Sequence, residues 1–339
     1  MILVIPLVGL LSDRYGRKPT LIAGILLSGT GGVAIALTTD FRVALALRLL
    51  QGIGGSAIVP IVITSVGDLY ERVTEATAQG IRYTSTGVVQ VVIPAIAGIL
   101  AGIAWQYPFF LFLLAFPVAV VVYLLLDETG PSADKTEMNL KTGVRADSSS
   151  GSIRNLLAHR RVFATVLGRG IPAGVWIAFL TYNSIIVVQI RDGNPAQAGL
   201  VVAVASLAIV TASTQAGRIT TLFESRFYPL AAGHLLLSSG FVVVLFVPVF
   251  PGILGGSVLA GSGLGILMSI YRSFVTDLAT RPLRGRLVSV SETSGRIFLT
   301  VTPAAMGSAI TLLTPRLGFE LAVQTIGFCV ALAAVVVGI

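Results

Sequence analysis

The feature that most constrains this chain is a series of long apolar stretches with few charges or none. The stretches 20–39, 83–105 and 193–217 contain no acidic or basic side chain. A helix needs ~20 mostly apolar residues to cross the ~30 Å hydrocarbon core of a bilayer. Inside a bilayer the backbone must satisfy its own hydrogen bonds, which a helix does. These stretches therefore predict membrane-spanning helices.

Nine stretches reach the required length, and one of them is too long for a single span. They are 20–39, 43–67, 83–105, 106–126, 162–190, 193–217, 227–271, 287–314 and 321–339. The letters VPVFPG at 247–252 divide the stretch 227–271, because two prolines and a glycine favour a turn. The sequence predicts ten full spans, with a short opening run at 1–11 that is too short to cross alone. The fold class expected is an all-α polytopic membrane protein of about eleven helices.

The charge balance supports a membrane protein rather than a nucleic-acid-binding one. Only 11% of the residues are charged, whereas soluble domains average about 25%. The formal net charge is +8, but the bases cluster in short loops between apolar runs. This distribution is typical of the positive-inside rule. We expect a multi-pass protein of the cell membrane, with the loop 13–18 on the cytoplasmic side.

One long polar segment divides the chain. Residues 127–160 are rich in Ser, Gly, Asp and Lys, a composition typical of a flexible linker. The expected domains are an N-terminal bundle at 1–126, a cytoplasmic linker at 127–160 and a C-terminal bundle at 161–339.

An internal repeat relates the two predicted bundles. RKPTLIAG at 17–24 resembles RFYPLAAG at 226–233. The spacing of Gly52, Gly54 and Asp68 recurs in Gly261, Gly263 and Asp277. Two bundles built on one plan are typical of transporters that bind their substrate between the repeats.

A charged loop near the start carries a family resemblance. GLLSDRYGRKP at 9–19 meets the pattern G-x-x-x-D-R-x-G-R-K in full, and RLLQGIGGS at 48–56 meets R-x-x-Q-G-x-G. Both resemble motifs of the major facilitator superfamily, and the second occurs in many proton-coupled members. In the span that follows, Pro94 and Gly98 fit the motif of the drug–proton antiporter branch, whereas Ile93 stands where a glycine is expected. The resemblance implies a two-bundle fold holding helices 2 to 12 of a twelve-helix plan, N-terminally truncated with the first helix missing.

The resemblance also implies a conformational latch that stabilises closure of the cytoplasmic side. In this reading Asp13 faces the start of helix 11 near 282–285, and Arg17 pairs with Asp68. Gly16 supplies the backbone freedom that the tight turn needs. The alternative is a basic loop that only fixes orientation. The latch residues are Gly9, Asp13, Arg14, Gly16, Arg17, Lys18 and Asp68.

Polar side chains inside the spans are candidates for proton coupling or the substrate cavity, because such groups are costly in a bilayer. The resemblance links Arg48 to proton relay, with Gln51 one turn away, although a purely structural arginine is the alternative. Arg169 either binds an anionic substrate group, pairs with an acid elsewhere or extends toward the membrane surface. Glu292 and Arg296 lie four residues apart and can pair along one helix face. The remaining cavity candidates are Gln90, Tyr182 and Asn183.

The sequence predicts a transporter without metal or cofactor. It contains one cysteine and two histidines, and we find no enzyme motif. We expect secondary active transport of a small organic solute by alternating access, with proton-coupled efflux and a monomer embedded in the bilayer. Acids lie only at span ends in helices 2 to 10, so coupling falls to Glu292 or to an acid in the missing helix. The alternatives are a sugar or organic-acid facilitator or symporter, or a non-transporting truncated relative.

Overall fold

The computed structural model describes residues 11–12, 14–69, 72–127, 160–223, 225, 227–278 and 281–338. Every element that these residues form is helical. The first half of the chain contains α2 (Arg17–Ile35), α3 (Phe41–Leu69), α4 (Arg72–Ile103), the 3-10 segment η1 (Tyr107–Leu114) and α5 (Ala115–Leu125). The second half contains α8 (Arg160–Ser184), the π-helical segment η2 (Ile185–Ile190), α9 (Pro195–Thr221), α10 (Phe227–Phe246), α11 (Phe250–Leu278), α12 (Arg281–Leu317) and α13 (Phe319–Gly338).

Ten helices of the described chain are long and apolar enough to cross a membrane, which confirms the prediction of ten full spans. The predicted turn between the seventh and eighth spans is also present, because α10 ends at Phe246 and α11 begins at Phe250. The opening run at 1–11 lies almost wholly outside the described residues. So does most of the predicted linker at 127–160.

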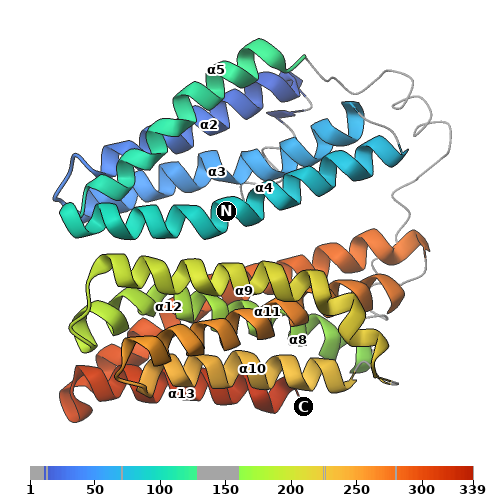
Figure 1. Ribbon diagram of the computed structural model, residues 1–339. Coiled ribbons are helices and arrows are strands. Elements are labelled where there is room, and N and C mark those ends of the chain that lie inside the picture. Colours follow the sequence, from blue (N-terminus) through green and yellow to red (C-terminus); the bar gives the residue numbers. More distant parts are fainter. Residues whose placement is uncertain are drawn as a thin grey trace. The chain divides into compact units, whose positions relative to one another are not determined.

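The contacts divide the chain into two compact units (Figure 1). Unit 1 comprises Met1–Val88 and Ile99–Asp147, and unit 2 comprises Val89–Gly98 and Ser148–Ile339. The middle of α4 therefore groups with unit 2. In unit 2, α8 to α13 run alongside one another as a helical bundle (Figure 1). The domain bounds 1–126, 127–160 and 161–339 stay a prediction.

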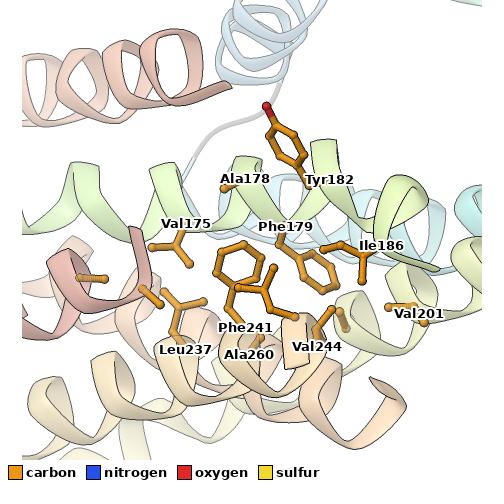
Figure 2. Close-up of a cluster of buried hydrophobic side chains, with 14 of the residues drawn as sticks. Val175, Ala178, Phe179, Tyr182, Ile186, Val201, Leu237, Phe241, Val244 and Ala260 are labelled. Atoms are coloured by element: carbon orange, nitrogen blue, oxygen red, sulfur yellow. The ribbon is translucent and has the colours of Figure 1, made fainter. Parts of the chain in front are cut away.

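A core of buried apolar side chains holds unit 2 together (Figure 2). Phe179 of α8 stacks on Trp176, with ring centroids 5.2 Å apart, and meets Phe241 of α10 edge-on at 6.5 Å. Leu237 and Val244 complete this layer from α10. Helices in a bilayer gain little from the hydrophobic effect, so close packing of this kind supplies much of their attraction.

The same glycine contact recurs in both units, as the internal repeat predicts. A Cβ added to Gly54 of α3 would lie 2.6 Å from the carbonyl oxygen of Gly24 on α2. A Cβ added to Gly263 of α11 would lie 2.6 Å from the carbonyl oxygen of Gly233 on α10. No side chain fits at that distance, so both helix pairs approach along glycines.

The turn before α2 has the conformation that the sequence predicts. Gly16 has φ 94°, a value that favours glycine over residues with a Cβ. Its backbone N–H donates to the carbonyl of Ser12 at 3.0 Å, and its own carbonyl accepts from the Thr20 hydroxyl at 2.7 Å. Both backbone groups of Gly16 are therefore hydrogen-bonded.

Candidate functional site

Two glycines bring α8 and α12 close together in unit 2. A Cβ added to Gly174 would lie 2.9 Å from Oγ1 of Thr302, and one added to Gly170 would clash with the ring of Phe298. Small residues at a helix crossing let the backbones approach closely. Long side chains on the two helices can therefore reach each other, and Arg169 lies in this stretch of α8.

Arg169 forms an ion pair with Glu292 of α12. Its Nη2 lies 2.5 Å from Oε1 of Glu292, and its Nη1 donates to the Ser291 hydroxyl at 3.4 Å. The arginine side chain is only 7% exposed, whereas that of Glu292 is 49% exposed. A buried cation is costly without a partner, so the carboxylate and the hydroxyl together stabilise the position of Arg169.

This ion pair tests the predictions made from the sequence for Arg169 and for Glu292. Of the alternatives for Arg169, the structure shows pairing with an acid elsewhere in the chain. The predicted pair of Glu292 with Arg296 along α12 is wrong, because the carboxylate turns to α8 instead. Arg296 is exposed. The four-residue spacing allowed the local pair. Glu292 pairs with Arg169 instead, because that cation is buried and needs a charged partner, whereas the exposed Arg296 can be solvated.

Two further cavity candidates, Tyr182 and Asn183, lie on α8, and Tyr182 belongs to the buried core cluster. Asn183 is buried, and its Nδ2 donates to the carbonyl of Ala198 on α9 at 2.8 Å, which ties the two helices together. Tyr182 is buried too, but its hydroxyl points away from the cluster shown in Figure 2. A Cβ added to Gly307 of α12 would lie 3.5 Å from this hydroxyl. Gln90 is exposed and lies in the part of α4 that groups with unit 2.

Unit 1 holds its in-span arginine in a different way. Nη1 of Arg48 donates to Oε1 of Gln51, one turn along α3, at 2.8 Å. The guanidinium also lies 5.2 Å from the centre of the Phe109 ring, a cation–π distance. Gln51 is buried, whereas Arg48 is exposed. The structure therefore brings Gln51, the neighbour one turn away, into direct contact with Arg48.

The latch prediction falls largely outside the described residues. Gly9 and Asp13 are not among them, and α3 includes Asp68 without a description of its side chain. Of the bases, Lys18 lies 5.2 Å from the centre of the Tyr123 ring on α5, and the Arg14 guanidinium lies 5.5 Å from the ring of Tyr15. The pairings expected for Asp13 and for Arg17 with Asp68 stay predictions.

Two polar contacts in unit 2 were not predicted as pairs. Nε2 of His234 on α10 lies 3.0 Å from the Tyr271 hydroxyl on α11, within hydrogen-bonding distance. Arg191, which follows η2, pairs with Glu320 of α13 at 3.2 Å and donates to the carbonyl of Leu245 at 2.8 Å. Their sequence separations, 37 residues and 129 residues, leave no local signal for either pair. Among the described residues, no cluster of His, Cys, Asp and Glu side chains has the form of a metal site.

The ten long apolar helices and the repeated helix pairs are typical of a multi-pass helical membrane protein. A model of the Major Facilitator Superfamily matches residues 1–190, which is more than half of the chain. The chain therefore belongs to the major facilitator superfamily.

The relatives of known sequence include exporters and resistance proteins. The chain is 36% identical to the bacillibactin exporter of Bacillus subtilis (strain 168) over 115 residues, which are 32% of this chain and 29% of that protein. It is 26% identical to the multidrug transporter protein MdtP of the same bacterium over 38% of this chain and 25% of that protein. The match therefore spans less than a third of either exporter. The tetracycline resistance protein, class B, of Escherichia coli is 28% identical over 86% of this chain and 72% of that protein.

Solved structures show the same fold at low sequence identity. A bacterial homologue of the human lysosomal transporter Spinster, in an inward-facing and unoccupied conformation, has a TM-score of 0.75 at 16% identity. That alignment covers 98% of this chain and 83% of the homologue. A D-xylose–proton symporter has a TM-score of 0.71 at 13% identity, with the same two coverages.

Proposed function

We propose that this protein exports a small organic solute in exchange for protons, by alternating access. The observation that carries the proposal is the ion pair between Arg169 and Glu292. Relatives named as exporters or resistance proteins support the direction of transport. The orientation proposed is that of the positive-inside rule, in the cell membrane with the loop 13–18 and the linker 127–160 cytoplasmic.

Glu292 has the environment that a proton carrier needs. Among the ten described spans, the acidic residues are Glu292 and Glu320, and Glu320 is the second residue of its helix. Glu292 is the third residue of the apolar span Val290–Leu317 and is half exposed, so protons can reach it. Its partner Arg169 is buried, so the carboxylate supplies the charge that compensates this cation.

Proton binding at Glu292 is therefore linked to a structural change. A neutral Glu292 leaves Arg169 with the Ser291 hydroxyl as its remaining polar partner. The buried cation then favours any arrangement of α8 and α12 that offers it water or another anion. A proton that shifts an equilibrium between two arrangements is the thermodynamic requirement for coupling.

Arg48 is proposed to serve the solute or its counter-ion. Its contacts among the described residues are neutral, namely the Gln51 amide and the Phe109 ring. The positive charge is thus not cancelled in place and is available to an anionic group. Gln90, Tyr182, Asn183 and Arg296 are proposed as further cavity positions, and Gly9, Asp13, Arg14, Gly16, Arg17, Lys18 and Asp68 as the latch.

The test is transport by the full chain in proteoliposomes, with tetracycline as the first probe because of the resistance relatives. Solute movement against its own gradient, driven by an imposed pH gradient of opposite direction, is expected for the wild type. E292Q should lose at least about tenfold of this driven transport and keep downhill flux, while the control E320Q keeps both.

Other outcomes contradict parts of the proposal. Flux without any response to pH indicates a facilitator, and movement of solute with protons in one direction indicates a symporter. No flux of tetracycline or of a panel of organic acids and sugars, from a folded protein, indicates a non-transporting relative.

A further inference from the structure

A buried polar pair in unit 2 lies apart from the residues that the proposed function uses. His234 has no exposed surface, and Tyr271 is 6% exposed. Their contact, 3.0 Å between Nε2 and the hydroxyl oxygen, joins α10 to α11. Buried polar groups of this kind are costly unless they are bonded to each other, so the pair holds both side chains in one arrangement.

The tyrosine hydroxyl reaches beyond its partner to α8. A Cβ added to Gly168 would lie 2.5 Å from the Tyr271 hydroxyl oxygen and 3.1 Å from its ring carbon. The tyrosine thus occupies the space that the missing side chain of Gly168 leaves. The next residue along α8 is Arg169, whose side chain extends to α12.

The histidine is held from its other side by α13. A Cβ on Gly338 would clash with the His234 ring, so this ring lies against the backbone of the last turn of α13. The order of contacts is therefore α13, His234, Tyr271, Gly168 and then the ion pair on α12. Each contact is made by a polar side chain or a glycine.

We propose that the His234–Tyr271 pair positions α8 so that Arg169 meets Glu292. The proposal rests on the proposed function for its effect on coupling, but not for its geometry. A buried hydroxyl fixed by a histidine is a rigid spacer, because neither group can turn away without losing its hydrogen bond. A shift of α8 by ~1 Å would lengthen the Arg169–Glu292 contact of 2.5 Å to the weak end of the hydrogen-bonding range.

The first test is a double-mutant cycle for thermal unfolding in detergent, with Y271F, E292Q and Y271F/E292Q. If Tyr271 acts through the ion pair, Y271F lowers Tm by ~2–4 °C in the wild type and by clearly less in E292Q. Y228F is the matched control, because Tyr228 on the same unit is 60% exposed. Equal losses in both backgrounds would overturn the proposal.

The second test uses transport and a conservative replacement. Gradient-driven tetracycline transport should fall ~three- to tenfold in Y271F and show no further loss in the E292Q background. H234L should behave as Y271F does. H234Q should recover most of the loss, because its amide oxygen can accept the tyrosine hydrogen bond.

The two tests separate this inference from the proposed function. If E292Q transports as the wild type does, proton coupling through Glu292 is wrong, and the thermal cycle still decides whether Tyr271 positions the pair. If E292Q loses coupling but Y271F does not, the positioning role is wrong and the proposed function stands.

Discussion

The two units of this protein each hold an arginine inside a span, and they hold it by different means. In unit 1, Arg48 is exposed and bonds to neutral groups, one of them on its own helix. In unit 2, Arg169 is buried and paired with a carboxylate from another helix. The internal repeat places Ser257 at the position equivalent to Arg48, and Ser257 is fully buried with its hydroxyl donating to the Leu254 carbonyl. The repeated architecture thus requires no charge at this point.

The buried apolar core is also larger in unit 2 than in unit 1. In the described chain the buried cluster of unit 2 draws on six helices, whereas that of unit 1 draws on α2, α3 and α5. In unit 2 the buried cation of Arg169 is neutralised within the packing by Glu292. In unit 1 the side chain of Arg48 stays exposed, and its contacts among the described residues are neutral groups.

Exchanging the residue types of Arg48 and Ser257, which occupy equivalent positions in the repeat, should have the largest effect on folding and transport. S257R places an unpaired cation at a position with no exposed surface, and we expect loss of folded protein because such a charge costs several kcal/mol. The reverse change, R48S, should leave a folded protein with at least about tenfold less transport. Detergent size-exclusion chromatography followed by the proteoliposome assay measures both, and a folded S257R would contradict the comparison.

Removing one member of the buried pair should come next in size. R169L leaves Glu292 without its cation and removes two hydrogen bonds. We expect the free energy of unfolding to fall by about 1–3 kcal/mol. The loss is smaller than for a fully buried pair, because Glu292 is half exposed and water screens its charge. R48L should change stability by less than about 0.5 kcal/mol, because Arg48 is exposed. Equal losses, measured by thermal or denaturant unfolding, would show that the two arginines are held alike.

Alanine in place of the contact glycines should destabilise the two units equally, because both units share this helix contact. G54A and G263A each place a Cβ about 2.6 Å from a facing carbonyl oxygen, and overpacking of this kind costs about 1–3 kcal/mol. G102A is the matched control, because nothing lies within 4 Å of a Cβ at that position. A clear difference in Tm between G54A and G263A would mean that the repeat does not extend to packing.

The exposed ion pair of unit 2 should matter least. Glu320 is 54% exposed and pairs with Arg191 at a helix end, where such pairs contribute about 0.2–1 kcal/mol. E320Q should lower Tm only slightly, and the loss should shrink further in high salt because the screening length falls. A loss of stability as large as that of R169L would mean that burial does not explain the difference in strength between the two ion pairs.

Much of the fold was predictable because the signals are local. The ten spans follow from apolar length, and the turn after α10 follows from two prolines and a glycine. The bond between Arg48 and Gln51 was also predictable, since residues three apart on a helix face each other. The same rule for residues three or four apart gave the wrong partner for Glu292, because it does not consider side chains on a neighbouring helix such as Arg169.

The sequence alone determined that this chain spans a membrane repeatedly, that its halves repeat one plan and that it resembles the major facilitator superfamily. Each of these follows from short stretches, because a bilayer sets helix length and glycine spacing sets which helices can approach. Only the tertiary structure decided that Arg169 meets Glu292 across 123 residues and that Tyr271 packs against Gly168. Those partners depend on where helices cross, and a crossing is fixed by the packing of all the helices around it.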